Sequence, residues 1–362
     1  MNVLRAILTA ACCGGLAGSA HAQISLVPPS VSPPQVTNTP EPKPKKTIPI
    51  KRPAAPAEKP KTPDAAKTPE LSAEELNAAV LNEAPNVDMV YGAYQRGQYR
   101  TAFDFATLRA REKNDTAAMT MLGELYANGQ GIKRDYGKAI QWYKRASDLG
   151  DREAMFALAM LRIGGRGGPP DREEGARLLA SSAKLGEPKA CYNLALLYMD
   201  GQTLPQDFKR AAELLRTAAD AGNDDAQYAL ASFYREGTGV EKDIDKSVRL
   251  LQAASLAGNV PAEVEYAIAL FNGTGTTRNE AAAISLLRKA ARQNNAIAQN
   301  RLARVLTLGK GVPVDKIEGL KWHLVAKTSG KGDLMLDEML SQLSPEDRAK
   351  VEAAAEKWLG AK

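Results

Sequence analysis

The chain has very little of the chemistry that most catalytic and metal sites require. Its 362 residues include three cysteines and two histidines. Cys12, Cys13 and His21 all lie within the first 22 residues, which leaves Cys191 and His323 for the rest of the chain. Zinc sites and Cys/His dyads need more ligands than these two residues supply. We therefore expect no metal, no cofactor and no internal disulfide, with a buried Cys191 and a packed or edge position for His323.

The main part of the chain also has little net positive charge. The net charge is +6, but segment 23–70 holds eight lysines and arginines against four acids. That segment therefore carries +4 and Arg5 one more, so about +1 remains after residue 70. A nucleic-acid-binding domain would show a basic patch or stripe. We expect no nucleic-acid partner.

The first 22 residues have the layout of a secretory signal peptide. One cation, Arg5, precedes an apolar run over 6–20, and Ala20-His21-Ala22 spells an A-x-A cleavage site. The run is too short for a membrane span, which needs about 20 mostly apolar residues. We expect cleavage after Ala22, a periplasmic or secreted protein, and membrane contact through this segment before cleavage. Lipid attachment at Cys12 or Cys13 is the weaker alternative.

Segment 23–70 is rich in proline and lysine and holds thirteen of the 21 prolines. Such a composition cannot bury enough apolar surface to offset the entropy of ordering, and proline favours an extended chain. We expect a disordered tether, and its Lys/Pro alternation resembles linkers that cross the periplasm or the cell wall. A capping-box spelling at Ser72 predicts a short helix that Pro85 ends.

The stretch "REGTGVEKDIDKS" contains Gly237 and Gly239, which could form a phosphate cradle or a turn. The same spelling recurs at a spacing of 36 residues. The other copies are Gly129/Gly131, Gly165/Gly167, Gly273/Gly275 and Gly309/Gly311, and Gly201 has Thr203 in place of the second glycine. A fixed interval of this length indicates a repeat architecture, so we interpret the pair as part of a structural turn.

Registering the chain on these glycines gives six copies without an insertion: 115–150, 151–186, 187–222, 223–258, 259–294 and 295–330. The fourth residue of each copy is Ala, and the eighth is Leu in five copies and Tyr in one. Apolar residues at this spacing predict one face of a helix, here called helix A, which the first glycine closes. An Asp or Asn such as Asp135 then caps a second helix, helix B, which ends at Gly150 or its equivalents.

A single helical hairpin cannot bury its own apolar stripe, so the copies must stack and the ends must be capped. We expect segment 71–114 to hold the short helix and a capping hairpin that turns at Gly97. Segment 331–362 is expected to hold capping helices, the second of which opens at Ser344-Pro345. The predicted fold is all-α, an α/α superhelical solenoid of six 36-residue hairpins with capping helices.

The copies spell A-x-x-x-L-[GA]-x-x-Y-x-x-G-x-G and then D-x-x-x-A-x-x-W-[YL]-x-x-A-x-x-x-G. This pattern resembles the Sel1-like repeat family, an α/α solenoid related to tetratricopeptide repeats, over residues 115–330. Arg162 and Leu270 depart from it, and the cysteines of the disulfide-stapled branch are missing. The resemblance implies an adaptor that holds a protein or peptide on its concave surface. The tether and the hairpin after it also resemble exported alphaproteobacterial members, including regulators that restrain a sensor kinase.

The sequence favours an adaptor over an enzyme. Paired carboxylates such as Glu173-Glu174 and Asp224-Asp225 stand at helix starts, where acids stabilise the helix dipole. We therefore expect no catalytic residues. A cell-wall-associated protein, or a carboxylate-dependent hydrolase acting on peptidoglycan, stays open as the alternative.

The sixth, seventh and tenth residues of each copy, which we call the helix A face, change chemistry from copy to copy. The packing residues hardly change. We expect the partner to bind this face through an aromatic and polar anchor with charged flanks. The anchor is predicted at Tyr192, Asn193 and Tyr228, flanked by Glu265, Arg301 and Arg304. In the resemblance, Asn193 matches a position that can hydrogen-bond an extended ligand. Alternatively, these are ordinary solvated residues, with the two tyrosines packing between repeats.

Overall fold

The computed structural model describes residues 88–360, in which every element is a helix. The predicted signal peptide, the tether and the helix at Ser72 lie outside the described residues. The six repeats correspond to the helix pairs α5 Thr116–Asn128 and α6 Tyr136–Asp148, α7 Arg152–Ile163 and α8 Arg172–Lys184, α9 Pro188–Asp200 and α10 Phe208–Asp220, α11 Asp224–Glu236 and α12 Ile244–Leu256, α13 Val260–Asn272 and α14 Glu280–Arg292, and α15 Ala296–Leu308 and α16 Lys316–Thr328.

Additional helices close both ends of the stack. The hairpin of α3 Met89–Gln95 and α4 Tyr99–Glu112 precedes the repeats and turns at Gly97, as predicted. The helices α17 Leu334–Ser341 and α18 Pro345–Gly360 follow them. Ser344 caps α18, since its Oγ accepts a hydrogen bond from the backbone N–H of Asp347 at 3.1 Å. The predicted all-α solenoid with capped ends is confirmed.

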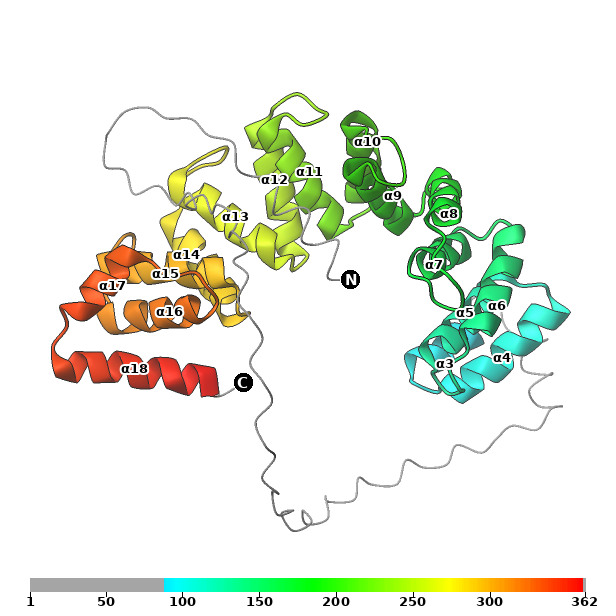
Figure 1. Ribbon diagram of the computed structural model, residues 1–362, viewed down its shortest axis with the longest axis horizontal. Helices are drawn as coiled ribbons and strands as arrows, with labels where there is room; N and C mark the ends of the chain where they lie inside the picture. Colours follow the sequence, from blue (N-terminus) through cyan, green and yellow to red (C-terminus); the bar gives the residue numbers. More distant parts are fainter. Residues whose placement is uncertain (1–87, 361–362) are drawn as a thin grey trace, which may run out of the picture.

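The helices stack in chain order into an arc that runs from α3 and α4 to α17 and α18 (Figure 1). Each repeat helix packs against its neighbours in the chain, and α5 also contacts α7 of the next repeat. In Figure 1, α7 and α9 lie toward the inside of the arc, with α8 and α10 outside them. In these repeats helix A therefore lies on the concave side.

Side-chain caps start both helices of every repeat. Asp135 and its equivalents accept a backbone N–H at the start of helix B, as predicted. The first residue of each copy caps helix A in the same way, which the sequence reading did not assign. These residues are Asp115, Asp151, Glu187, Asn223, Asn259 and Asn295. Such a cap contributes about 0.5 to 2 kcal/mol, so the polar residues that punctuate each copy fix where its helices begin.

The two glycines of each G-x-G have different roles. The first ends helix A in the left-handed conformation in five copies, and α7 ends one residue earlier, at Gly164. The second lies against the preceding hairpin: a Cβ on Gly131 would stand 2.8 Å from backbone atoms of Tyr99 and Arg100. A Cβ on Gly275 would stand 2.9 Å from two side chains of α12. The second glycine thus allows successive repeats to approach, beyond the turn that the sequence predicted.

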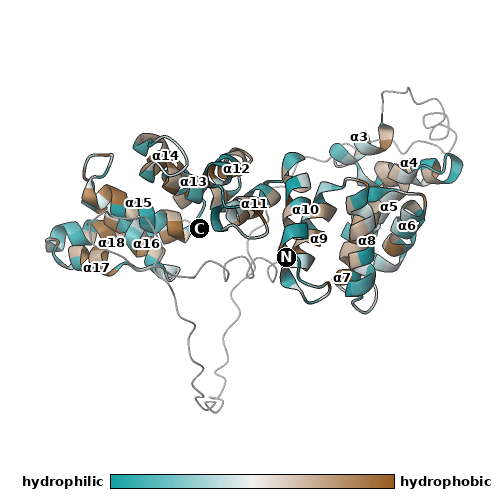
Figure 2. Ribbon diagram, turned by 90° about the horizontal axis from the view of Figure 1, so that it is seen from above, coloured by the Kyte–Doolittle hydropathy of each residue, from teal (hydrophilic) through white to brown (hydrophobic). Residues whose placement is uncertain are grey.

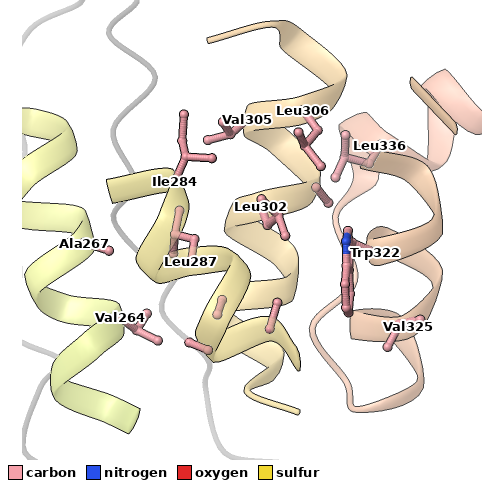
Figure 3. Packing of buried hydrophobic residues seen from close by; sticks show 14 of the residues in the cluster. Val264, Ala267, Ile284, Leu287, Leu302, Val305, Leu306, Trp322, Val325 and Leu336 are labelled. Atoms are coloured by element: carbon pink, nitrogen blue, oxygen red, sulfur yellow. The ribbon is translucent and has the colours of Figure 1, made fainter. Parts of the chain in front are cut away.

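The buried stripes of the helices form the core along the arc. Both hydrophobic and hydrophilic residues occur along individual helices, as Figure 2 shows, which is typical of helices with one packed side. Figure 3 shows Leu287 of α14, Leu302 of α15 and Leu336 of α17 among the side chains between successive helices, and all three are fully buried. Gly123 confirms the need for small residues, because a Cβ there would lie 2.5 Å from the Tyr143 ring.

The two residues with metal-binding or nucleophilic potential belong to the packing. Cys191 is buried, and desolvation followed by the charge of Glu187 raises the pKa of its thiol. His323 is fully buried, and its Nε2 lies 2.9 Å from Asp337 Oδ1. Hydrogen bonds from Lys327 and His323 lower the pKa of the Asp337 carboxyl. The predictions of a buried Cys191 and a packed His323 are confirmed.

Candidate partner-binding surface

The six predicted site residues lie on the A helices of four successive repeats. Two stand on α9, one on α11, one on α13 and two on α15: Tyr192, Asn193, Tyr228, Glu265, Arg301 and Arg304. They form an extended strip instead of lining one pocket. A hollow of about 340 Å³ between α16 and α18, and another of about 400 Å³ along α14, are lined by none of them. The strip suits an elongated partner better than a small molecule.

Tyr228 and Glu265 are brought together across the boundary between the fourth and fifth repeats. The Tyr228 hydroxyl donates a hydrogen bond to Glu265 Oε1 at 2.8 Å. The Arg235 guanidinium forms an ion pair with the other oxygen of the same carboxylate. The Arg235 and Glu265 side chains are 33% and 27% exposed. This charged and aromatic group therefore links α11 to α13 while part of it still faces solvent.

Arg235 is a residue that the sequence reading missed. It stands seven residues after Tyr228 on α11, which is about two helical turns and places both residues on one side of the helix. Its Nη2 also lies 3.5 Å from Ser232 Oγ, one turn before it. The spacing of Tyr228, Ser232 and Arg235 along one helix was the available signal.

The first two anchor residues, Tyr192 and Asn193, are held within their own part of the stack. Tyr192 is half-buried and packs against the cluster that includes Ala195 and Leu215. The Asn193 amide donates a hydrogen bond to the backbone oxygen of Lys189, one turn earlier, at 2.8 Å. Tyr228 likewise packs against a small buried cluster. The structure thus gives both tyrosines a packing role and leaves part of each at the surface.

Arg301 differs from the sequence prediction of an accessible flanking residue. It is 3% exposed, and its Nε has no hydrogen-bond partner among residues 88–360. The fifth repeat has Val264 and Phe271 at the positions that hold Tyr228 and Arg235 in the fourth, and both are buried. Burial and then the charge of Arg304 lower the pKa of Arg301 to about 10, against the opposing effect of Asp333.

Arg304 is partly covered by the connection between α16 and α17. Its Nε lies 2.8 Å from Asp333 Oδ2, and the two side chains are 24% and 10% exposed. Asp333 also caps α17 by accepting the backbone N–H of Met335 at 3.1 Å. Asn300 donates to the backbone oxygen of Lys331 at 3.2 Å. The C-terminal cap therefore closes over the last part of the helix A face.

A similar tyrosine–glutamate pair occurs at the opposite end of the array. The Tyr94 hydroxyl, from the capping hairpin, donates to Glu124 Oε1 at 2.8 Å, and Glu124 is the tenth residue of the first copy. Burial and then this hydrogen bond raise the pKa of Tyr94 to about 12. Polar contacts across neighbouring hairpins therefore recur on the helix A face.

Three of the paired carboxylates at helix starts, Glu174, Asp224 and Asp225, make structural contacts. Asn259 donates to both Asp224 and Asp225 at 3.2 Å, which ties the fifth repeat to the fourth. Glu174 forms an ion pair with Arg162 at 3.0 Å. Within residues 88–360 there is no cluster of three His, Cys, Asp or Glu residues that could hold a metal ion, and no helix long and apolar enough to cross a membrane.

Comparison with known proteins gives consistent results for the repeat region. The Sel1 repeat model matches residues 116–151, 152–187, 188–223, 224–259, 260–295 and 296–330, more than half of the chain. No curated protein matches the chain.

Solved structures with a similar fold include the following two. One is a protective antigen of uropathogenic Escherichia coli with an SLR fold, which matches with a TM-score of 0.65 at 22% identity over 80% of this chain. This chain spans 64% of that protein's length. The other is a Sel1 repeat protein from Oxalobacter formigenes, with a TM-score of 0.58 at 27% identity over 66% of this chain and 98% of that one.

Proposed function

The chain belongs to the Sel1 repeat family, and from that premise we propose that it is an adaptor that binds a polypeptide along the helix A face of its middle repeats. Proteins of this family generally mediate protein–protein interaction and are generally scaffolds without enzymatic activity. The observation that supports the proposal best is the group formed by Tyr228, Glu265 and Arg235, which combines an aromatic ring with opposite charges at a partly exposed repeat boundary. Tyr and Arg are the residues in which binding energy tends to concentrate.

The adaptor is proposed to act outside the cytoplasm. The signal-peptide layout of the first 22 residues and the proline-rich segment after it support export to the periplasm or beyond. A tether followed by a solenoid suits envelope signalling, such as the restraint of a sensor kinase from the periplasmic side. The intact mass of the mature protein tests export: we expect a form that begins at Gln23, and a form that begins at Met1 or carries lipid on Cys12 or Cys13 would contradict it.

The peptidoglycan hydrolase gains no specific support as an alternative. Its best candidates were the carboxylate pairs at helix starts, and Glu174, Asp224 and Asp225 all take part in contacts within or between repeats. Acids at these positions also stabilise the helix N-terminus.

Site-specific photocrosslinking in the native cell envelope tests the binding face. A photoreactive residue would replace Asn193 or Met160, which lie on helix A, and Arg249, which is exposed on helix B of the fourth repeat, as the control. We expect one adduct of defined mass from the two helix A positions and none from Arg249. A second change, Glu265→Lys, should remove that adduct while the protein still folds. Equal adducts from both helices, or an adduct that survives Glu265→Lys, would refute this face.

A further inference from the structure

Arg301 is an exception among the buried charged groups of the described residues. Glu187 is 6% exposed and lies 3.6 Å from Arg152. Glu263 is fully buried and forms an ion pair with Lys289. Arg301 is 3% exposed, and its Nε has no hydrogen-bond partner within residues 88–360. Removing an unpaired cation from water costs several kcal/mol. A negative group beside Arg301 would offset this cost.

The neighbouring residues supply less negative charge than the two arginines require. Arg304 stands three residues after Arg301 on α15, a spacing that makes the two side chains neighbours on the helix surface. Asp333 is paired with Arg304 at 2.8 Å and also caps α17. Two guanidinium groups thus share one carboxylate that already has two contacts. The group of Arg301, Arg304 and Asp333 therefore has two positive charges and one negative charge.

We propose that Arg301 and Arg304 form a carboxylate-binding site, in which a carboxylate of the bound polypeptide pairs with Arg301. This inference rests on the proposed function and adds the recognition chemistry at one end of the helix A face. A guanidinium group presents a planar fork of donors that fits a carboxylate through two parallel hydrogen bonds. The pairing of Asp333 with Arg304 shows that this surface already accommodates a carboxylate.

The surroundings of Arg301 favour such a pairing. Arg301 occupies the same position in the sixth repeat as Glu265 in the fifth, so a chain that lies along the A helices meets both. Val264 and Phe271 stand where the preceding repeat has the two residues that pair with Glu265, and both are buried and apolar. The fifth repeat therefore offers Arg301 no polar partner at these two positions, and an ion pair is stronger where water is scarce.

The test uses the full chain, labelled with ¹⁵N, and follows the arginine Nε–H signals by NMR at constant ionic strength. Three small probes separate the possible sources of the carboxylate. N-acetylglutamate α-amide carries a side-chain carboxylate, N-acetylglutamine carries a main-chain carboxylate, and N-acetylglutamine amide carries none. We expect a saturable shift of the Arg301 signal with at least one carboxylate probe and no shift with the neutral probe. The probe that acts identifies the source.

Two variants assign the effect to this site. Arg301→Met should remove both the Arg301 signal and the rise in melting temperature that a carboxylate probe gives the wild-type protein. Arg288→Met, an exposed arginine on α14, is the matched control and should leave both intact. The wild-type titration with its neutral control needs neither variant to fold.

Three other outcomes would refute the proposed carboxylate-binding site. These outcomes are no saturable shift with either carboxylate, an equal shift with the neutral probe, or an unchanged rise in melting temperature in Arg301→Met. Because the probes are small molecules, the result does not depend on capture of a partner. If the probes bind and crosslinking from helix A fails, the site stands and the proposed adaptor surface is wrong.

Discussion

The boundary between the fourth and fifth repeats and the boundary between the fifth and sixth share one register but differ in chemistry. At the first boundary, Glu265 is paired with Tyr228 and Arg235 from the preceding repeat and keeps part of its surface exposed. At the second boundary, Arg301 takes the place of Glu265 and is buried, and its Nε–H donates no hydrogen bond to any described residue. The repeat therefore fixes where a side chain stands, and the preceding copy decides whether its charge is paired.

The packing residues, in contrast, are nearly the same at both boundaries. The fourth residue of every copy is a fully or almost fully buried Ala, and the eighth is a buried Leu in five copies. Because each repeat contacts mainly its neighbours, stability is roughly a sum over repeats and their interfaces. Substitutions should therefore separate into those that open the constant stripe and those that alter the variable face.

The largest expected effect is in the constant stripe of the third repeat. Leu194 is 5% exposed within a buried cluster, so Leu194→Ala should leave a cavity and lower the free energy of unfolding by about 2 to 5 kcal/mol. Urea unfolding followed by circular dichroism measures this loss.

The adjacent residue provides the matched control for this comparison. Asn193 lies on the helix A face, and its amide bonds the backbone of its own helix. Asn193→Ala should change the free energy of unfolding by less than about 0.5 kcal/mol, as is usual for surface substitutions. A loss as large as that of Leu194→Ala would mean that face and stripe are not separable.

The division between stripe and face also explains how much the sequence could predict. The helices, the helix B caps and the closing glycines depend on residues within one copy, so spacings such as that of Asp135, Ala139 and Gly150 were enough to predict them. The approach of Gly131 to the preceding hairpin and the Arg235–Glu265 pair depend on how copies overlap, which one copy does not contain. The contacts of Asn300 with Lys331 and of Arg304 with Asp333 depend likewise on the connection to α17. Comparing equivalent positions in neighbouring copies would have been the useful signal.

The second prediction is that replacing the charged residue by Met has opposite effects on stability at the two boundaries. Replacing Arg301 by Met keeps much of its length and removes a buried charge, so the free energy of unfolding should rise by roughly 1 to 4 kcal/mol without a ligand. Glu265→Met should lower it, since Arg235 and Tyr228 would lose their partner. Thermal unfolding of both variants in the same buffer is the measurement. Destabilisation by Arg301→Met would show that its charge is already compensated.

The third prediction concerns the fifth residue of each copy, where the same two boundaries differ again. Gln227 and Gln299 donate to the backbone oxygens of Ala219 and Ala291, eight residues earlier, at 3.2 and 3.1 Å. Glu263 stands at this position in the fifth copy, fully buried, and its Oε2 has no hydrogen-bond partner among the described residues.

The amide of Glu263→Gln could donate to the oxygen of Ser255, as its equivalents do, and should raise the free energy of unfolding by about 1 kcal/mol. The exposed Lys289 would lose its ion pair, but its side chain is 52% exposed and loses little. The reciprocal change, Gln299→Glu, should destabilise the protein by a similar amount in the same urea titration. A loss of stability in Glu263→Gln would show instead that the fifth copy follows different packing rules at this position.

The smallest expected effect is the coupling between Tyr228 and Glu265, which measures how far the paired boundary contributes to stability apart from binding. A double-mutant cycle of Tyr228→Phe and Glu265→Gln removes the hydroxyl donor and the negative charge of the acceptor in the 2.8 Å hydrogen bond, separately and together. We expect a coupling of about 0.5 to 1 kcal/mol, because the contact is charge-assisted but about a quarter of the Glu265 side chain faces solvent. Urea unfolding of the four proteins gives the value. A coupling above about 2 kcal/mol would make this group a structural clamp, and a partner would then have to compete with it for the same carboxylate.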